Sequence, residues 1–429
     1  MEEKKPVTEY YHAHKVIPER CHGHMTCMRN CPTQAIRVRA DKARISEDLC
    51  VDCGICISVC PCGAIVPIYD PVGEISRFKY KVVIPSPVLY SQFDSRIHPY
   101  VIHLALKRIG FDEVVDVTLS SRAIDRALVQ YLENYRGRLP LISSYCPSIL
   151  RLIQVKYPDL VEQSVPFDVP REVAAREIRK NIPAKLGLKP EDIGIVYIAP
   201  CPAIIVSIKQ PAEKARSWFD GVVSLKDVYS ALFPLVVAIE KEFNESQVPE
   251  DFSFHPGWST LGGIARMGQM ENWLAVSGMD HTMQIFDDIE NSRLRNVDFV
   301  EALSCMLGCN GGPFTVENPY VARTNSFKQK EKYETPLALD EAEIGEKLKT
   351  GYFSLENPVL PRPTKHFDTD LETSIKRMKE RERVYQKLRQ INCGCCGSPT
   401  CMAFAEDFVR GEVDLTDCIF LAELNGEEE

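Results

Sequence analysis

The sequence has no long apolar run, no apolar leader and no excess of positive charge. Its longest uninterrupted apolar stretch, residues 231–239, is nine residues long and contains Pro234, whereas a membrane-spanning helix needs roughly 20. The chain starts with Met1-Glu-Glu-Lys-Lys and polar residues follow, so no signal peptide is predicted. A net charge of -9 provides no basic stripe for nucleic acid. We therefore expect a cytoplasmic protein without a membrane span and without a nucleic-acid partner.

Cysteine, by contrast, is abundant. The 429 residues include 17 cysteines, within an otherwise average composition of 45% hydrophobic and 26% charged residues. This length corresponds to about two to four domains. Because a reducing cytoplasm disfavours disulfides, metal ligation is the better interpretation of so many thiols. The cysteines form three groups, with eight in residues 21–62, four in residues 146–309 and five in residues 393–418.

The first group contains a repeated ligand motif. Its second half, Cys50-Val-Asp-Cys53-Gly-Ile-Cys56-Ile-Ser-Val-Cys60-Pro61, has the C-x2-C-x2-C-x3-C-P spacing of two-cluster ferredoxins, whose fourth thiolate binds the other cluster. Zinc is the alternative, but its ligands usually come in two separated pairs. The first half repeats this spacing with one histidine among its cysteines. Crossing the fourth ligands predicts one cubane at Cys21, His24, Cys27 and Cys60, and another at Cys31, Cys50, Cys53 and Cys56.

His24 stands where a second cysteine is expected. It keeps the spacing of the motif, and imidazole is a competent iron ligand. Replacing thiolate by imidazole removes a negative charge, so this cubane should be easier to reduce than its neighbour. The alternatives are a three-iron cluster or a water-ligated iron with His24 merely nearby. Cys62 is left over, and we expect it to pack instead of binding metal.

From about residue 78 the pattern alternates β-rich and helical runs, which is typical of parallel strands with crossover helices. The runs predicted as strands are residues 79–85, 113–118, 141–144 and 193–198, and those predicted as helices are residues 100–109, 123–135, 148–156 and 171–181. Cys146, Cys201 and Cys305 each follow a β-rich run, and Cys309 completes a C-x3-C pair. Ligand sites form at the carboxyl ends of parallel strands. We therefore expect these four cysteines to meet at one end of one sheet and to bind a cubane, with buried free thiols as the alternative.

Three segments here resemble the signature segments of the iron-only (FeFe) hydrogenases, specifically the group with sensory-type members. They are residues 143–147 (Ser-Ser-Tyr-Cys-Pro), 199–203 (Ala-Pro-Cys-Pro-Ala) and 301–313 (Glu-x3-Cys-x3-Cys-Asn-Gly-Gly-Pro). Pro85 and Ser86 resemble the loop that lines the di-iron pocket. The resemblance implies that Cys146, Cys201, Cys305 and Cys309 hold a cubane. It also implies that Cys309 bridges to a di-iron unit carrying carbon monoxide, cyanide and a dithiolate.

The chain departs from that family where the di-iron unit would be served. Ile204 stands where the family usually has a lysine that donates to a cyanide, and an isoleucine cannot donate. Tyr145 stands where the most active members have a proton-relaying thiol, although sensory-type members also lack that thiol, and a phenol with a reference pKa near 10 is a poor relay. The expected relay helix contains Asp125 but no glutamate before Glu133. The chain therefore keeps the cubane ligands but lacks the groups that would serve the di-iron unit. This combination favours a pocket whose hydrogen chemistry is impaired or lost.

The third group follows a linker and a charged helix. Residues 354–364 contain three prolines, and apolar residues then recur at helical spacing among charged ones up to Arg389. The C-x2-C-x4-C-x16-C spacing of Cys393, Cys396, Cys401 and Cys418 resembles the single-cluster domain of corrinoid iron-sulfur proteins and of some sensory-type hydrogenases. Zinc is the alternative, since four thiolates also suit it. Cys395 is the spare thiol.

The sequence thus predicts three modules and a linker. They are a ferredoxin-like α+β domain at residues 1–76, an α/β hydrogenase-like domain at 77–353, a linker with a charged helix at 354–391, and a small helical iron-sulfur domain at 392–429. Four 4Fe-4S clusters imply low-potential electron transfer, with ferredoxin-type or flavoprotein partners. The alternatives are an FeFe hydrogenase, which would be an oxidoreductase, and a hydrogen or redox sensor.

Overall fold

The structure is a computed structural model that describes residues 10–362 and 370–421. The chain divides into two compact units. The described part of unit 1 comprises residues 10–68, 154–158, 361–362 and 370–421, and unit 2 comprises residues 69–153 and 159–360. The N-terminal and C-terminal cysteine groups therefore belong to the same unit, although more than 300 residues separate them. Part of the predicted linker, residues 363–364, lies outside the described residues.

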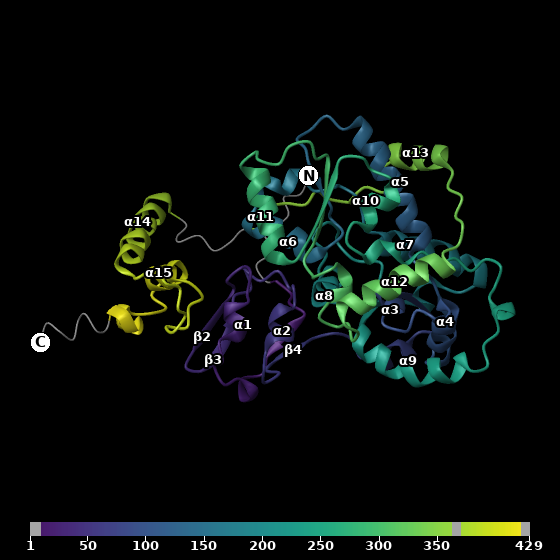
Figure 1. Ribbon diagram of the computed structural model, residues 1–429, viewed down its shortest axis with the longest axis horizontal. Helices are drawn as coiled ribbons and strands as arrows, with labels where there is room; N and C mark the ends of the chain where they lie inside the picture. The colour runs from purple at the N-terminus through teal and green to yellow at the C-terminus, as the bar shows by residue number, and fades with distance from the viewer. Residues whose placement is uncertain (1–9, 363–369, 422–429) are drawn as a thin grey trace, which may run out of the picture. The chain divides into compact units, whose positions relative to one another are not determined.

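The N-terminal half of unit 1 consists of two small antiparallel sheets and two short helices (Figure 1). The sheets are β1 (His14–Val16) with β4 (Ile65–Pro67) and β2 (Ile36–Arg39) with β3 (Lys42–Ile45), and the helices are α1 (Thr26–Arg29) and α2 (Ile55–Val59). Along β2, Ile36 and Val38 are buried while Arg37 and Arg39 are partly exposed. This period of two places one face of the strand in the core. The α+β prediction for this part is confirmed.

The C-terminal part of unit 1 is helical. It contains α14 (Leu371–Lys387), α15 (Cys401–Val409) and the 3-10 helix η8 (Leu415–Asp417). Asp370 caps α14 by accepting a hydrogen bond from the Thr373 N–H at 2.8 Å, as its residue type favours. Val384 and Leu388 are buried against Phe404. The predicted charged helix is therefore present, and its C-terminal end packs against α15.

Unit 2 contains two parallel sheets, where a single one was predicted. The first has the order β6 (Glu113–Val114), β5 (Tyr80–Pro85), β8 (Ile193–Ala199), β9 (Gly221–Ser224), and the second has the order β10 (Trp273–Ser277), β11 (Phe299–Leu303), β7 (Leu141–Ile142). All of these pairings are parallel, which confirms the α/β class. The error arose because a hydrophobic pattern identifies a strand but not its partner. β7 pairs with β11, more than 150 residues later in the chain.

Helices surround these sheets (Figure 1). They are α3 (Val88–Ser91), α4 (Pro99–Arg108), α5 (Thr118–Asn134), α6 (Pro147–Lys156), α7 (Pro170–Leu186), α8 (Pro202–Lys209), α9 (Leu225–Glu240), α10 (Gly263–Gly268), α11 (Met279–Glu290), α12 (Pro319–Tyr333) and α13 (Glu341–Lys349). Single 3-10 turns lie at Pro18–Arg20, Val72–Arg77, Pro158–Gln163, Pro190–Asp192, Glu245–Gln247, Pro256–Ser259 and Cys309–Gly311.

Two predicted boundaries are wrong in unit 2. The strand expected at residues 113–118 ends at Val114, and α5 already begins at Thr118. Because polar residues stand at the start of α5, the sequence pattern did not indicate a helix there. In the structure the Ser121 hydroxyl donates to the Val117 carbonyl at 3.1 Å, so this polar group is satisfied within the helix. α7 continues beyond residue 181, through Pro183, to Leu186. It ends at Gly187, whose φ of 65° suits glycine.

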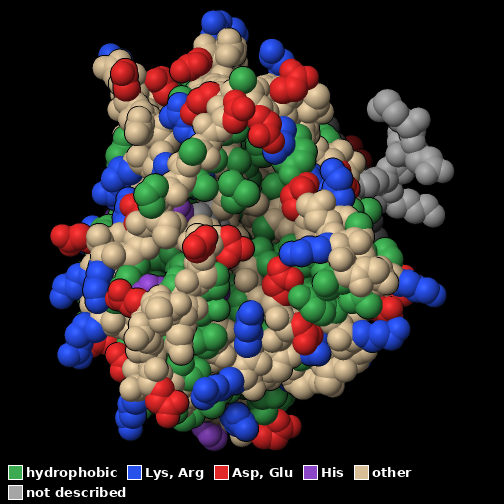
Figure 2. Space-filling view, turned by 90° about the vertical axis from the view of Figure 1, so that its right-hand side faces the viewer, with side chains coloured by type: hydrophobic (Ala, Val, Ile, Leu, Met, Phe, Trp, Pro, Cys, Tyr) green, Lys and Arg blue, Asp and Glu red, His purple; other side chains and the backbone are tan. Residues whose placement is uncertain are grey.

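The face shown in Figure 2 is neither mainly charged with one sign nor mainly hydrophobic. There, acidic and basic side chains are interspersed among hydrophobic ones. Among the described residues, no helix combines the length and the apolar character needed to cross a membrane.

Candidate metal centres

The first cavity of unit 1, here called the His24 cavity, is lined by Cys21, His24, Cys27 and Cys60. These are the residues predicted to share one cubane. The backbone N–H groups of Ala43 and Ala64 donate to the sulfurs of Cys21 and Cys60 at 3.3 and 3.2 Å. Burial raises the pKa of Cys27 to about 11. The pKa of Cys60 is lowered despite its partial burial, because backbone N–H groups such as that of Ala64 stabilise its thiolate.

His24 and Cys62 both lie at the rim of the His24 cavity. The His24 side chain is exposed, and its ring centroid is 6.1 Å from that of His22. Cys62, predicted only to pack, lines the same cavity with its sulfur 3.7 Å from that of Cys60. The cavity therefore offers a histidine and a further thiol beside the three predicted cysteines.

The second cavity of unit 1, the Cys50 cavity, is lined by the four other predicted ligands, Cys31, Cys50, Cys53 and Cys56. Gly54, whose φ is 78°, turns the chain between them. Burial and neighbouring negative groups raise the pKa values of Cys50 and Cys56 well above the usual range. Ionising four thiols in such a buried site is costly unless a cation neutralises the thiolates. The iron of a metal cluster would supply that positive charge.

A buried carboxylate, Asp52, and one of its two histidine partners, His14, line the Cys50 cavity together with the cysteines. Asp52 is 1% exposed and lies 2.9 Å from Nδ1 of His12 and 3.2 Å from Nδ1 of His14. Nε2 of His14 lies 3.7 Å from the Cys50 sulfur. No sequence motif points to this group, because His14 and Cys50 are 36 residues apart. The imidazole is positioned to orient the thiol.

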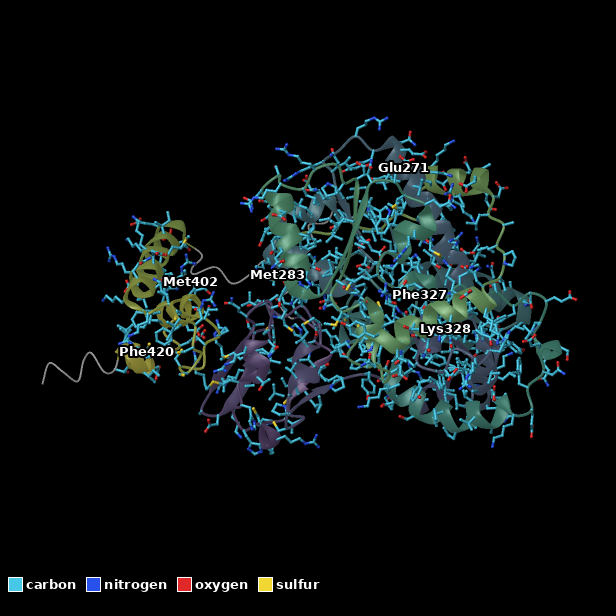
Figure 3. The ribbon with its side chains drawn as sticks, viewed as in Figure 1. Glu271, Met283, Phe327, Lys328, Met402 and Phe420 are labelled. Carbon is cyan, nitrogen blue, oxygen red and sulfur yellow. The ribbon has the colours of Figure 1, made fainter. Side chains whose placement is uncertain are left out.

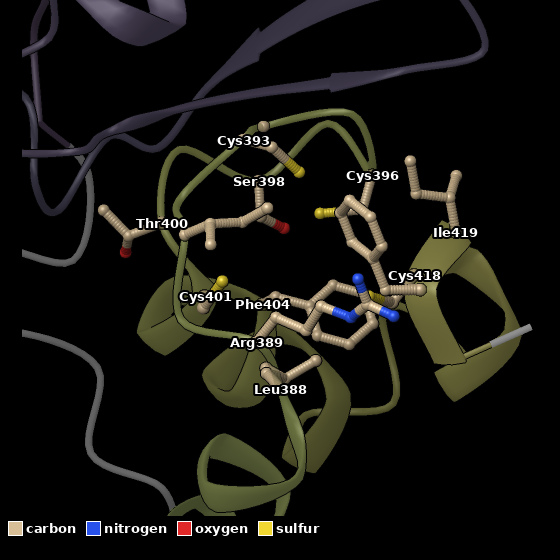
Figure 4. Close-up of a pocket in the computed structure, with 13 residues that line it drawn as sticks. Leu388, Arg389, Cys393, Cys396, Ser398, Thr400, Cys401, Phe404, Cys418 and Ile419 are labelled. Carbon is tan, nitrogen blue, oxygen red and sulfur yellow. The ribbon is translucent and has the colours of Figure 1, made fainter. Parts of the chain in front are cut away.

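The C-terminal cavity, called the Cys418 cavity, is lined by Cys393, Cys396, Cys401 and Cys418 (Figure 4). Phe404 and Leu388 form part of its apolar wall. Phe420 (Figure 3) also lines it, and the Arg389 guanidinium (Figure 4) lies over the Phe420 ring, 4.7 Å from its centroid. Cys395, predicted to be spare, is exposed and is not among the lining residues. Gly411, with a φ of 74°, turns the chain after α15 towards Cys418.

Two arginines of β2 connect the Cys418 cavity to the first half of unit 1. Arg37 and Arg39 both donate to Oδ2 of the buried Asp407, at 2.6 and 2.8 Å. Arg39 also donates to the carbonyl of Cys396 at 2.7 Å. A Cβ at Gly397 would lie 1.8 Å from the Val38 carbonyl, so only glycine permits this approach. The two cysteine groups of unit 1 are thus joined through a buried charge network.

The cavity of unit 2, the Cys309 cavity, is lined by Cys146, Cys201, Cys305 and Cys309. Cys201 follows β8 of the first sheet, whereas Cys146 and Cys305 follow β7 and β11 of the second. The expectation that all four meet at the end of one sheet is therefore wrong, because the site lies between the carboxyl ends of two. α6 and α8 begin directly after Cys146 and Cys201, so two helix N-termini favour negative charge here.

Close packing explains the glycines of the third signature segment. A Cβ at Gly312 would lie 2.6 Å from the carbonyl oxygen of Pro200, and one at Gly311 would lie 2.4 Å from that of Met306. Burial raises the pKa of Cys305 to about 12 and also raises the pKa values of Cys201 and Cys309, with neighbouring thiols adding to the effect. The arrangement can bind a cationic cluster but cannot easily hold free thiolates.

Both predicted departures face the Cys309 cavity. Ile204 is 3% exposed and lines the cavity, so its apolar side chain stands where a donor was expected. Tyr145 also lines it, and burial raises its pKa well above 10, which makes the phenol an even poorer proton relay. Pro85 ends β5, and the buried hydroxyl oxygen of Ser86 has no hydrogen-bond partner among the described residues.

The carboxylate predicted on the relay helix is blocked from Tyr145. Asp125 is fully buried, and its Oδ1 accepts a hydrogen bond from Nε1 of Trp258 at 2.7 Å. The ring of Trp258 packs edge-on against Tyr145, with centroids 4.0 Å apart. Burial raises the pKa of Asp125 well above its usual value. An indole, which donates but does not accept, separates the acid from the phenol.

Two further charged residues were not found from the sequence. Glu301 was noted only as part of a motif, and it is fully buried and accepts hydrogen bonds from the N–H groups of Gly262, Ile264 and Ala265. Burial raises its pKa to about 7. Arg171 is 4% exposed, and its charge partly offsets the burial that raises the pKa values of Cys201 and Tyr145. A charged residue within an apolar, β-rich run was the available signal for Glu301, whereas the helix that begins near Arg171 offered none.

Comparison with known families agrees with these sites. Residues 79–248 match the family described as iron only hydrogenase large subunit, C-terminal domain, and residues 20–64 match the 4Fe-4S dicluster domain. The chain carries an iron-only hydrogenase-like domain behind an N-terminal ferredoxin domain. Residues 388–420 of this hydrogenase-like chain match an Fe-S cluster family. The hydrogenase match includes Cys146 and Cys201 and ends before Cys305.

Curated relatives are similar to parts of the hydrogenase-like chain. Iron hydrogenase 1 of Clostridium pasteurianum is 24% identical over 242 residues, covering 53% of this chain and 40% of that protein. NADP-reducing hydrogenase subunit HndD of Solidesulfovibrio fructosivorans is 24% identical over 187 residues, covering 39% and 32%. Ferredoxin 7Fe of Hydrogenibacillus schlegelii is 42% identical over 52 residues, covering 12% and 67%. The chain thus spans less than half the length of the two hydrogenases.

Among solved structures, an apo FeFe-hydrogenase from Chlamydomonas reinhardtii has a TM-score of 0.49 and 15% sequence identity. The similarity covers 69% of this chain and 97% of that one.

Proposed function

We propose that this protein is a cytoplasmic electron-transfer subunit with four 4Fe-4S clusters on a hydrogenase-like scaffold whose own hydrogen chemistry is lost or impaired. One observation carries this proposal. Each of the four cysteine-lined cavities contains four predicted ligands, and together they account for 15 cysteines and His24. Bound clusters of this type exchange single electrons at low potential.

The donor sets fit such clusters better than zinc. In unit 1 the fourth ligand of each cavity comes from the other motif, Cys60 for the His24 cavity and Cys31 for the Cys50 cavity. A zinc site built from two pairs of ligands would not require a ligand from the other motif. Backbone N–H groups aimed at the sulfurs stabilise thiolates, which are the ligating form.

The proposed domains follow the cysteine groups. They are the ferredoxin-like residues 1–76, the hydrogenase-like residues 77–353, the linker and charged helix at 354–391, and the single-cluster residues 392–429. The C-terminal cluster would receive or deliver electrons through unit 1, because Arg39 joins the Cys396 carbonyl to β2. Suitable partners are ferredoxin-type or flavoprotein subunits of a redox complex.

Slow proton delivery is the reason to expect little hydrogen turnover. A proton relay needs a group that titrates near the working pH and contacts the next group. Tyr145 has a raised pKa, and Trp258 separates it from Asp125. If a di-iron unit were bound at Cys309, the residues around it would therefore deliver protons slowly.

The second candidate is an FeFe hydrogenase that uses other groups, because all four cubane ligands and the glycine loop are retained in the Cys309 cavity. A hydrogen or redox sensor is the third, on the resemblance to sensory-type members. In either case the di-iron unit would be bound in unit 2 at Cys309.

Iron and acid-labile sulfide in the anaerobically purified protein test the cluster assignment. Four cubanes require about sixteen of each. About eight irons with stoichiometric zinc would contradict the assignments outside the N-terminal motif.

Hydrogen evolution tests the impaired chemistry. Co-produced with the maturation enzymes and supplied with a low-potential donor, the chain should evolve negligible hydrogen. An active FeFe hydrogenase treated identically is the positive control. Robust evolution, accompanied by carbonyl and cyanide infrared bands, would support the hydrogenase instead.

A further inference from the structure

One hydroxyl lies between two of the sulfurs that line the Cys309 cavity. Ser304 directly follows β11, lines the cavity and is 8% exposed. Its Oγ is 3.4 Å from the Cys146 sulfur and 3.7 Å from the Cys305 sulfur. Within the described part of the chain, both hydrogen-bond partners of this hydroxyl are therefore sulfurs. In the third signature segment, Ser304 is one of the three positions without a prescribed residue.

The pairing of β7 with β11 holds Ser304 beside Cys146, which is 158 residues away in the chain. After β7, the Ser143 N–H donates to the Val300 carbonyl at 2.9 Å, and the Ala302 N–H donates to the Ser143 hydroxyl at 3.1 Å. These hydrogen bonds join the two strand ends just before the proposed ligands. The position of the Ser304 hydroxyl beside the Cys146 sulfur thus follows from the sheet.

Neighbouring hydroxyls bind the backbone instead. The Ser277 hydroxyl, at the end of β10, accepts a hydrogen bond from the Leu307 N–H at 3.3 Å. The Ser143 hydroxyl likewise accepts from a backbone N–H. Binding a backbone group is the commonest use of a buried serine side chain. Ser304 differs from both, because its contacts are to two proposed metal ligands.

The chemistry of these groups fixes which atom donates when metal is bound. A ligating sulfur is a thiolate, which has no proton and only accepts, whereas a serine hydroxyl has one proton to donate. With a single proton, Ser304 donates to one sulfur at a time, and the shorter distance favours Cys146. A hydrogen bond to an ionised acceptor is stronger than one between neutral groups.

We propose that Ser304 donates a hydrogen bond to the Cys146 thiolate of the unit 2 cubane and thereby raises the reduction potential of that cluster. The electron that enters a cubane on reduction increases the negative charge on its sulfurs, so a donor stabilises the reduced state more than the oxidised one. One electron comes from the redox partner, and no covalent bond is formed or broken. Ser304 is thus a positioning residue that acts on iron through a ligand. This inference rests on the proposed cubane of the Cys309 cavity.

A redox titration followed by electron paramagnetic resonance tests this role. The full chain is purified anaerobically as wild type, Ser304→Ala, Ser304→Thr and Ser277→Ala, and the iron content of each is measured. The signal of this cubane is the one that Cys201→Ala lacks. Ser277→Ala is the matched control, because Ser277 supports the same ligand loop through a backbone N–H. The measured quantity is a reduction potential, so no catalytic turnover is required.

We expect Ser304→Ala to lower the potential of this signal by about 59 mV, which corresponds to a tenfold change in the equilibrium constant for one electron. Ser304→Thr keeps the hydroxyl and should stay close to the wild-type potential, as should Ser277→Ala. An unchanged potential in Ser304→Ala would overturn the proposal. So would an equal shift in Ser277→Ala, because the position of the loop and not the hydrogen bond would then set the potential.

A second measurement does not depend on the alanine variant holding its cubane. In electron-nuclear double resonance, a proton that exchanges with D2O should couple to the reduced cubane in wild type and in Ser304→Thr. Its absence from wild type would overturn the proposal.

The iron content separates this inference from the proposed function. If wild type holds about sixteen irons but Ser304→Ala leaves the potential unchanged, the inference fails while the electron-transfer function stands. If wild type holds only about twelve irons and lacks the signal of this cubane, both fail.

Discussion

The two units build their metal sites in opposite ways. In unit 1, three ligands of each N-terminal cavity lie within seven residues, Cys21–Cys27 and Cys50–Cys56, and backbone N–H groups support the sulfurs. In unit 2, the ligands are spread from Cys146 to Cys309 and come from two sheets. A local loop therefore carries one kind of site, and a folded α/β core carries the other.

This difference explains which metal site tolerates substitutions of the residues around its ligands. A cluster loop has few residues besides its ligands, so its chemistry depends directly on the motif. The Cys309 cavity is lined by side chains from several helices, and each can be exchanged while the core persists. Ile204 and Tyr145 are such exchanges.

The largest expected effect comes from removing one ligand in each unit. Cys56→Ala and Cys201→Ala should each lose about four of sixteen irons. Only Cys56→Ala should also become sensitive to protease at residues 21–62, because metal binding contributes most of the folding energy of a small cluster loop. Limited proteolysis with iron analysis measures this. Equal protease sensitivity of both units would contradict the comparison.

The next effect concerns the network that joins the two halves of unit 1. Asp407→Ala removes the shared acceptor of Arg37, Arg39 and Ser398 and should destabilise unit 1 by about 3–5 kcal/mol, as for a broken buried ion pair. Its neighbour Glu406, which pairs with Arg381 near the surface, provides the control. Glu406→Gln should cost less than about 1 kcal/mol. Denaturant unfolding measures both, and similar midpoints would argue against the network.

A smaller, pH-dependent effect is expected in unit 2 at Glu301. Its folded pKa of about 7 lies above the value of about 4.3 for a free glutamate. The folded state thus holds this proton more tightly, so the contribution is present at low pH and is lost as the pH rises through 7. Relative to Glu301→Gln, wild type should lose about 2 kcal/mol of unfolding free energy between pH 5 and 8.

Urea unfolding at both pH values measures that difference. Glu271 is exposed (Figure 3), so Glu271→Gln should follow wild type at both pH values and serves as the control. A constant difference between wild type and Glu301→Gln would mean that Glu301 does not titrate differently in the two states.

The smallest expected change is electronic and concerns unit 1. If His24 is a ligand, His24→Cys should keep four irons and lower the potential of that cluster, because thiolate adds negative charge. Redox titration followed by electron paramagnetic resonance measures the potential. Cys62→Ser is the control, since Cys62 lines the same cavity but is not a predicted ligand. An unchanged potential in His24→Cys, or a lost cluster in Cys62→Ser, would make Cys62 the better candidate.

The cluster motifs could be predicted because their ligands are near neighbours in the chain. The spacing around Cys50 and Cys393 brings sulfurs together through local turns, at Gly54 and at Gly394 and Gly397, whose φ values are all positive. Likewise, the alternation of apolar runs identified β5, β8 and the helix α4. A residue 36 positions away, such as His14 behind Cys50, left no such signal.

What remained hidden in the sequence depends on which distant elements pair. The partnership of β7 with β11, which puts the Cys309 cavity between two sheets, cannot be read from a hydrophobic period. The same holds for Glu301 and Asp407, whose partners are brought to them only by packing. Arg171 reads as one charge on an ordinary helix, and only its burial leaves Nε and Nη1 without a hydrogen-bond acceptor among the described residues. The ligands of each local motif can thus be predicted from the sequence, because short-range chain geometry brings them together. The charged groups around each site depend instead on long-range burial in the folded chain.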